Sequence, residues 1–197
     1  MSFRLGLTGS IGMGKSTTAK LFEEAGCAVW DADAAVHRMY AKGGAAVAPI
    51  QSALPEAIQD SAVSRERLKE MIGRDASVLK LLEQIVHPLV AKDRVEFMET
   101  TRVDIVVFDI PLLFEGGGDA SMDAVVCVSV PAELQKQRVM ERGTMSEDQF
   151  EQIRAKQMPN DEKCARSDYV VITDTLDHAR AQVDKIVETI RGQLTDA

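Results

Sequence analysis

The sequence predicts an α/β fold in which helices flank a five-stranded parallel sheet. The first observation is that short apolar runs, which suit buried strands, alternate with segments of helical periodicity. The second is a glycine-rich stretch between the first apolar run and the first helical segment, Gly9-Ser10-Ile11-Gly12-Met13-Gly14-Lys15-Ser16. Because such a loop lies where the strand order of an open sheet reverses, we expect the first strand at the centre of the sheet.

This stretch fits the pattern G-x-x-x-x-G-K-[ST], the phosphate-binding P-loop. Its glycines let successive N–H groups converge on phosphate oxygens, and the following helix turns its positive end to the same anion. Lys15 would supply charge to the β- and γ-phosphates, and Ser16 would offer a hydroxyl to Mg²⁺. The alternative is a glycine turn that precedes Lys-Ser by chance. We therefore expect a P-loop NTPase, with nucleotide contacts from Gly9, Ser10, Ile11, Gly12, Met13, Gly14, Lys15, Ser16 and Thr17.

Length and composition disfavour several classes of protein. The 197 residues suit one domain, 1–197, with a sizeable core. A net charge of −8 argues against nucleic acid as the main partner. No signal-peptide pattern is present, and no apolar run approaches the roughly 18 residues of a membrane span. The three cysteines lack metal-binding spacing, so we expect free thiols, which suit a cytoplasmic location. We also expect a monomer or small homo-oligomer.

The strands are predicted from the apolar runs, each of which stands between helical segments. They lie at 4–8, 27–30, 104–109, 124–130 and 169–173. The run at 104–109 is rich in β-branched residues without polar alternation, which suits a strand that is covered on both faces. Strands that alternate with helices predict right-handed crossovers and hence a parallel sheet.

The helices are predicted from 3.6-residue periodicity and from capping residues. They lie at 17–25, 34–41, 64–73, 77–86, 89–98, 131–142, 146–157 and 175–192. Ser64 caps the third helix, and Ser146 with Gln149 forms a capping box for the seventh. Asp174 or Thr175 caps the last one. His87-Pro88 is expected to bend or restart the helical segment that contains it.

Two carboxylates follow the second strand. Asp31 and Asp33 are two residues apart, so in extended backbone both point to one side at the carboxyl end of the strand. This is the edge at which open α/β sheets bind ligands, and the pair would act as a base or organise Mg²⁺. The alternative is that an Asp caps the following helix. Both interpretations hold together if one Asp caps and the other acts.

Residues 42–100 form a mostly helical insertion between two predicted strands. It is longer than a simple crossover, so we expect it to cover a substrate. Arg65 and Arg67 lie in the first turn of a helix there, where the helix dipole disfavours cations. Such a position indicates either a ligand contact or a solvated arginine.

Asp109 ends the most apolar strand and is expected beside the P-loop as the carboxylate on the Mg²⁺ side. The apolar stretch after it, 110–115, either lines a pocket or packs as a loop. Further on, Arg138 and Arg142 are four residues apart and so share a helix face, and the next helix carries more basic residues. This cluster indicates a closing lid over 138–165, or alternatively a helical hairpin with solvated charges.

In these residues the chain resembles one family, the dephospho-CoA kinases, along nearly its whole length. Many kinases share the P-loop, so the specific motifs are Asp31-Ala32-Asp33 and Pro111-Leu112-Leu113-Phe114-Glu115. The other matching positions are Arg65, Leu68, Leu82-Glu83, His87-Pro88, Asp109-Ile110, Arg138, Arg142 and Gln157. The resemblance implies a fold similar to nucleoside-monophosphate kinases, with a helical substrate domain and a lid. The chain departs from the family near Thr173 and Asp174, where an Asn is usual.

The resemblance also implies a reaction, the ATP-dependent phosphorylation of the 3′-hydroxyl of dephospho-CoA to coenzyme A, with ADP as the other product and Mg²⁺ as cofactor. Asp33 resembles the base, and Lys15 with the loop amides would hold the phosphoryl group. Arg138 and Arg142 resemble cations that offset its charge. The positions that match the metal site are Ser16 and, through a water molecule, Asp109. Those that match the acceptor site are Asp31, Asp33, Arg65, His87, Leu112, Leu113 and Glu115.

Two other classes of function compete with this interpretation. Another small-molecule kinase, acting on a nucleotide or a sugar, is disfavoured only by the combined motifs at 31–33 and 111–115. A P-loop switch without transferase activity is disfavoured because Pro131-Ala132-Glu133-Leu134 follows the fourth strand, in place of the guanine signature Asn-Lys-x-Asp. Turnover of a hydroxyl acceptor with ATP separates all three.

Overall fold

A computed structural model describes residues 2–195. The chain divides into two compact units. The first contains the chain up to Trp30 and from Thr101 onward, and the second contains Asp31–Thr100. This second unit starts earlier than the helical insertion expected at 42–100. It also contains Asp31, Asp33 and the helix at Ala32–Tyr40.

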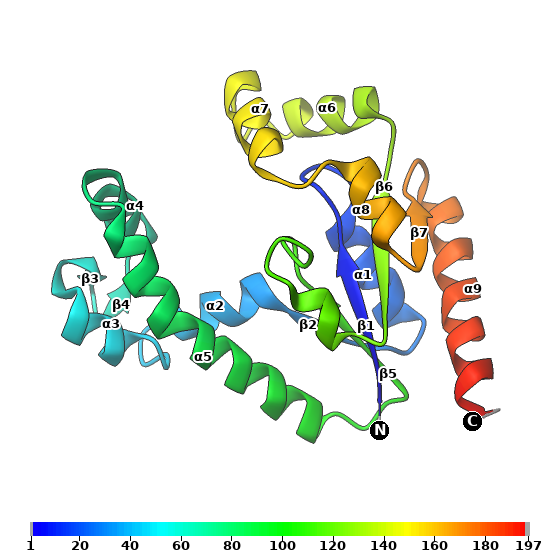
Figure 1. Ribbon diagram of the computed structural model, residues 1–197, viewed down its shortest axis with the longest axis horizontal. Coiled ribbons are helices and arrows are strands. Elements are labelled where there is room, and N and C mark those ends of the chain that lie inside the picture. The colour runs from blue at the N-terminus through cyan, green and yellow to red at the C-terminus, as the bar shows by residue number, and fades with distance from the viewer. Residues whose placement is uncertain (1, 196–197) are drawn as a thin grey trace. The chain divides into compact units, whose positions relative to one another are not determined.

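The first unit is built on a five-stranded sheet with the order β2-β5-β1-β6-β7 (Figure 1). The strands are β1 (Phe3–Thr8), β2 (Ala28–Asp31), β5 (Ile105–Asp109), β6 (Ala124–Ser129) and β7 (Tyr169–Ile172). β1 pairs in parallel with both β5 and β6, and β6 pairs in parallel with β7. The prediction of five strands with the first at the centre is therefore confirmed.

Helices and loops cover both faces of this sheet. On one face, α1 (Lys15–Glu24) and α9 (Leu176–Thr195) share the main apolar cluster with alternate residues of the strands, among them Leu5, Leu7 and Val126. On the other face, Val125 packs with Leu113 and Phe114 of the loop after β5. Figure 1 shows α8 (Asn160–Arg166) beside β6 and α9 beside β7.

Three further helical segments complete the first unit: η2 (Gly118–Ser121), α6 (Ala132–Glu141) and α7 (Glu147–Lys156). The capping box at Ser146 is present, with Gln149 N–H donating to Ser146 Oγ at 3.3 Å and Ser146 N–H donating to Gln149 Oε1 at 2.9 Å. Thr175 caps α9, because its Oγ1 accepts from His178 N–H at 3.2 Å.

The cysteines are free thiols, as expected. Cys27 and Cys127 are buried, and Cys164 is half-buried. Burial raises the pKa of Cys27 to about 11, so this thiol stays protonated at neutral pH.

The second unit consists of α2 (Ala32–Tyr40), α3 (Val47–Ala53), η1 (Pro55–Ala57), a hairpin, α4 (Arg65–Arg74) and α5 (Ser77–Thr100). α5 contacts α2, α3 and α4, and Arg38 pairs with Asp93 at 3.0 Å between α2 and α5. The cap at Ser64 is confirmed, since its Oγ accepts from Arg67 N–H at 3.3 Å.

Several predicted boundaries are wrong. Of the two alternatives at His87-Pro88, a bend or a restart, the restart is wrong, since α5 runs unbroken past Pro88. The hairpin of β3 (Ile58–Gln59) and β4 (Ala62–Val63) was not predicted. Its turn residues Asp60 and Ser61 have φ of 52° and 63°, which Asn-Gly usually supplies. α8 was also not predicted, and α9 continues beyond Gly192.

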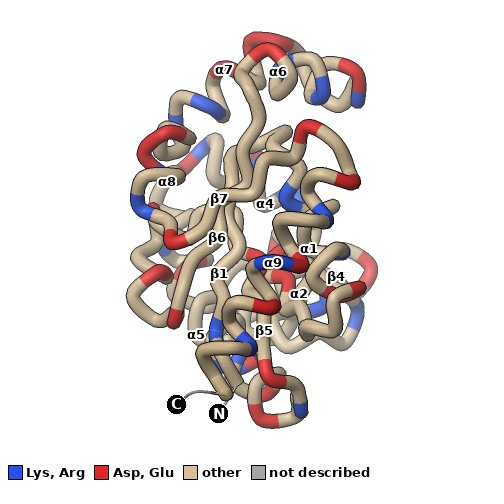
Figure 2. Tube along the Cα trace, turned by 90° about the vertical axis from the view of Figure 1, so that its right-hand side faces the viewer, with Lys and Arg blue, Asp and Glu red and all other residues tan. Residues whose placement is uncertain are grey.

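In each unit the charged residues lie mainly on helices and loops (Figure 2). Within residues 2–195, no helix combines the length and the apolar character that crossing a membrane requires.

Candidate active site

The P-loop joins β1 to α1. Gly12 and Gly14 have φ of +77° and +90°, a region that L-residues with side chains seldom enter. Gly9 lies so close to β6 that a Cβ there would be 2.2 Å from Val128 Cγ2. Gly14 is the N-cap of α1 and no side chain caps this helix end, so its first amides are oriented to bind an anion.

Lys15 forms an ion pair with Asp109, the last residue of β5. Leu7 of β1 is paired in register with Asp109, so the parallel strands bring this carboxylate to the P-loop edge. The Asp109 side chain is 4% exposed and that of Lys15 is 17% exposed. The expected position of Asp109 beside the P-loop is therefore correct.

The oxygen donors at this edge suit Mg²⁺, a hard cation that protein carboxylates and hydroxyls bind together with substrate phosphates. Among residues 2–195 there is no group of three or more His, Cys, Asp or Glu side chains that could enclose a metal ion. Ser16 and Asp109 would therefore supply a minority of the ligands, with phosphate oxygens and water supplying the others.

The peptide groups of Ile11 are held by two glutamines. Gln135 of α6 donates through Nε2 to Ile11 O at 2.7 Å, and Gln157, which follows α7, accepts from Ile11 N–H at 3.2 Å. Gln135 is buried, so its amide has exchanged water for this contact. The conformation of the P-loop tip is thus linked to both helices.

Met13 connects the P-loop to two strand ends. Its Sδ accepts from Val130 N–H at 3.3 Å, and its carbonyl accepts from Thr173 Oγ1 at 2.7 Å. Arg138 in turn donates to Thr173 O at 2.6 Å and to Asp174 O at 3.3 Å. Arg138 therefore ties α6 to the segment after β7, whereas Arg142 is exposed at the end of α6.

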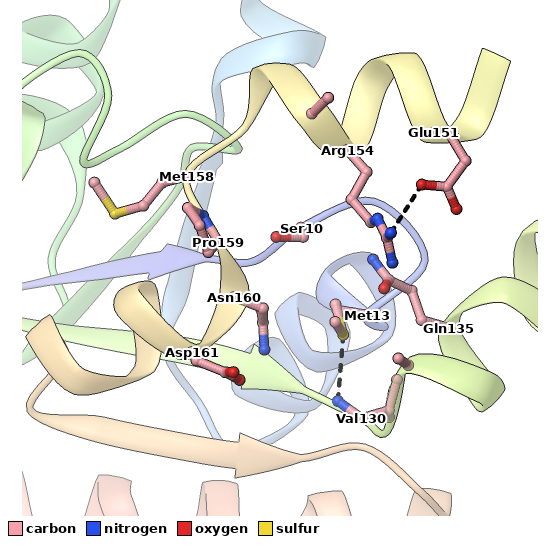
Figure 3. A pocket seen from close by; sticks show the side chains of 12 residues that line it. Ser10, Met13, Val130, Gln135, Glu151, Arg154, Met158, Pro159, Asn160 and Asp161 are labelled. Carbon is pink, nitrogen blue, oxygen red and sulfur yellow. Dashed lines mark hydrogen bonds and ion pairs between the residues drawn. The ribbon is translucent and has the colours of Figure 1, made fainter. Parts of the chain in front are cut away.

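A pocket of about 380 Å³ lies between the P-loop and helices α6, α7 and α8 (Figure 3). Ser10 and Met13 of the loop line it, together with Gln135, Arg154 and Asn160 from the helices. Arg154 pairs with Glu151 at 2.8 Å. Asn160 Nδ2 donates to Ser129 Oγ at 2.8 Å, while its buried Oδ1 has no hydrogen-bond partner within the described chain. The pocket therefore combines polar side chains of the three helices with apolar ones such as Met13 and Met158.

In the segment 110–115 some side chains are exposed at the surface and others are buried in the core. Leu112 is 49% exposed, whereas Leu113 is fully buried in the cluster with Phe114 and Val125. Glu115 Oε1 accepts from Met158 N–H and pairs with Lys163 Nζ, both at 2.9 Å. Burial alone would raise the pKa of Glu115, but these hydrogen bonds outweigh it, so the pKa lies below its usual value. The segment therefore packs as a loop, and its lining of a pocket stays a prediction.

The remaining expected site residues belong to the second unit. Asp31 Oδ1 caps α2 by accepting from Ala34 N–H at 2.9 Å, and Asp33 is exposed in the first turn of that helix. The Arg65 guanidinium lies 5.8 Å from the centre of the Tyr40 ring. His87 is exposed on α5.

Three residues with roles in this geometry were not predicted as site residues: Gln135, Thr173 and Lys163. Gln135 and Thr173 each hold the P-loop through one hydrogen bond. Neither the residue type nor the spacing of these two residues in the sequence predicts such a contact. Lys163 stands in the polar run Asn160-Asp161-Glu162-Lys163, which predicts a solvated lysine, yet it is completely buried.

Comparison with known proteins identifies a family whose members match nearly the whole chain. The profile of the family described as dephospho-CoA kinase matches residues 3–177. A dephospho-CoA kinase of Ruegeria pomeroyi is 69% identical over 98% of both chains, and one of Cereibacter sphaeroides is 55% identical over 96% of both.

Among solved structures, TT1252 from Thermus thermophilus superposes with a TM-score of 0.85 at 30% identity, over 95% of this chain and 97% of that one. The dephospho-CoA kinase of Campylobacter jejuni, at 23% identity and a TM-score of 0.70, covers 98% of this chain and 100% of its own and shares the fold. The matched residues, 3–177, include the sheet strands, the P-loop and the segment after β5. The chain therefore belongs to the dephospho-CoA kinase family.

Proposed function

We propose that this protein transfers the γ-phosphoryl group of ATP to the 3′-hydroxyl of dephospho-CoA, which gives coenzyme A and ADP. The observation that carries the proposal is the P-loop with Lys15 and Asp109 at one sheet edge, in a chain of this family. Phosphoryl transfer needs alignment and electrostatic stabilisation more than covalent chemistry, and this edge supplies fixed amides and a mobile cation.

The residues of the P-loop bind the phosphates of ATP in this proposal. Amides within 9–17 hold the β-phosphate, and Lys15 exchanges its carboxylate partner for phosphate oxygens. Ser16 and Asp109 hold Mg²⁺, Asp109 through water, and the ion neutralises charge that develops between the β- and γ-phosphates. Arg138 and Arg142 offset charge on the transferring group, Arg138 from a position that Thr173 supports.

Asp33 is the proposed base. Asp31 is engaged as the cap of α2, which supports the division in which one carboxylate caps and the other acts. Asp33 is exposed in the first turn of that helix, so its carboxylate can meet a hydroxyl group of a bound acceptor. It would accept the hydroxyl proton of the acceptor as the oxygen attacks phosphorus.

In this proposal the acceptor is bound by the side chains of Asp31, Arg65, His87, Leu112 and Glu115. Leu113 contributes as packing beneath the segment, because it is buried. Residues 42–100 cover the acceptor, and the lid is narrower than 138–165. It comprises α7 and its flanks, because α8 packs on β6.

The decisive experiment is a coupled assay of ADP release with ATP and Mg²⁺ over a panel of hydroxyl acceptors. We expect turnover of dephospho-CoA, with mass spectrometry showing one added phosphate at the ribose. Turnover of adenosine or a sugar without turnover of dephospho-CoA would contradict the proposal.

Replacing Asp33 by Asn tests the base. We expect kcat to fall by about 10²-fold or more while ATP binding stays within twofold, because the amide cannot accept the proton. Asp184→Asn, on the exposed side of α9, is the matched control and should behave like the parent. Normal kcat in Asp33→Asn would remove Asp33 from this role.

A further inference from the structure

Lys163 of α8 is a charged side chain with no exposure to solvent. Lysine is almost never fully buried without a partner. Its ammonium group pairs with Glu115 Oε1 at 2.9 Å and donates to Pro111 O at 3.3 Å. One cation therefore holds both ends of the Pro111–Glu115 segment.

The contact with Pro111 O reaches the end of the strand that carries the P-loop. Pro111 O also accepts from Thr8 Oγ1 at 3.1 Å, and Ile110 N–H donates to Leu7 O at 3.0 Å. The segment thus leaves β5 fixed against the end of β1. At its other end, Glu115 Oε1 is shared with Met158 N–H, so Lys163 meets a carboxylate that the chain already orients.

A second cation of the same helix supports the middle of this region at the surface. The Arg166 guanidinium lies 4.5 Å from the centre of the Phe114 ring and 3.2 Å from Asp119 Oδ2. Its side chain is 42% exposed, so solvent screens this pair. The two cations differ in that Lys163 alone touches the two ends of the segment.

Stability is a weak explanation for this lysine. A buried ion pair gains little over an apolar pair of the same volume, because removing both charges from water offsets their attraction. A methionine would fill the same space between α8 and the loop. What an apolar side chain lacks is a directional contact with Pro111 O and with Glu115 together.

We propose that Lys163 is a positioning residue that sets the conformation of Pro111–Glu115 for acceptor binding, an inference that rests on the proposed function because only that function assigns the segment to dephospho-CoA. The exposed Leu112 is presented between the two fixed ends. The hydrogen bonds and the ion pair of Lys163 among the described residues involve neither Lys15 nor the P-loop amides, which hold ATP in the proposed function, so the two substrates depend on Lys163 differently.

The test is the kinetics of Lys163→Met. We expect KM for dephospho-CoA to rise by about tenfold, which corresponds to 1.4 kcal/mol, while KM for ATP stays within twofold. Lys185→Met makes the same change on the exposed side of α9 and should leave both constants unchanged. Equal rises in both KM values, or no change in either, would overturn the proposal.

A second variant keeps the test decisive if Lys163→Met does not fold. Glu115→Gln removes the carboxylate and retains an acceptor oxygen, and it should raise KM for dephospho-CoA in the same selective way. A double variant should be no worse than the more impaired single variant, because both changes remove the same ion pair. Additive losses would contradict the shared role.

Hydrogen exchange gives a readout that is independent of turnover. The amides of Gly116 and Gly118 donate within the loop to Leu112 O at 3.0 Å and Leu113 O at 2.8 Å. In Lys163→Met they should exchange faster than in the parent, whereas amides of β1 should not change. Unchanged exchange would refute positioning by Lys163. If the parent does not turn over dephospho-CoA, the proposed function fails whatever the exchange data show.

Discussion

At the scale of single residues, the P-loop requires glycine for two separate reasons. Gly12 and Gly14 have positive φ, so any L-side chain there is strained. Space is lacking as well. A Cβ on Gly12 would lie 2.6 Å from Val139 Cγ2, and one on Gly14 would lie 2.9 Å from Thr173 Oγ1. Both the backbone and its neighbours therefore select glycine.

We expect Gly12→Ala to raise KM for ATP and to lower Tm. Left-handed backbone costs alanine about 1–2 kcal/mol, and the Cβ must also displace Val139 or the loop. Gly143→Ala is the matched control, because Gly143 has φ of +63° with open space around it. It should lower Tm alone. Equal effects of the two variants on KM for ATP would show that packing around the loop is unimportant.

At the scale of elements, the P-loop depends on helices and strands that lie more than a hundred residues away in the sequence. Gln135 of α6 and Thr173 after β7 each hold one of its carbonyl groups. Removing a buried partner leaves a backbone group without a hydrogen bond, which costs roughly 1–3 kcal/mol. Helix α6 is thus part of the nucleotide site through a residue that does not touch phosphate.

Replacing Gln135 by Leu should raise KM for ATP several-fold and lower Tm, because Ile11 O loses its donor. Gln137→Leu is the control on the same helix. Gln137 is exposed and donates to Glu141, one turn away, so its loss should change neither quantity. Steady-state kinetics and thermal unfolding measure the difference. If the two variants have the same KM for ATP and the same Tm, Gln135 does not support the P-loop through Ile11 O.

Helices and strands were predicted correctly where both faces of an element are buried and its sequence is uniformly apolar. They were missed where contacts with distant segments decide whether an element forms. The strands at β5 and β6 are apolar on both faces, so their runs identify them. Helix α8 has a polar sequence, and only docking on β6 buries Lys163. The β3–β4 hairpin turns at Asp60-Ser61, a pair that carries little turn signal.

At the scale of the whole molecule, three carboxylates join segments far apart in the chain. Asp104 binds Arg191, Asp123 binds Arg4, and Glu115 binds Lys163. Hydrogen bonds from the guanidinium groups lower the pKa of Asp104 and of Asp123 below their usual values. For Glu115 burial opposes the shift, but the hydrogen bonds from Lys163 and Met158 N–H prevail and the pKa is lowered as well.

These shifts set the direction of the pH dependence. A folded pKa below the unfolded one adds stability that is complete above the unfolded value and is lost as pH falls through the folded value. We therefore expect Tm to be steady between about pH 7 and 5 and to fall below about pH 4.5 as the carboxylates are protonated. Asp104→Asn should show a smaller acid-induced fall in Tm, whereas Asp184→Asn should follow the parent. A steeper fall in Asp104→Asn would contradict this account.

The sequence by itself determined the class of fold, the central strand, the P-loop and the family. These four properties follow from local patterns, because strand periodicity, glycine spacing and the order of motifs can be read directly from the sequence. Tertiary structure decided which of those residues are available to a ligand. Leu113 is buried and Glu115 is held by Lys163, whereas Leu112 stays exposed. The physical reason is that burial and hydrogen-bond partners arise between segments distant in sequence, and no local pattern records them.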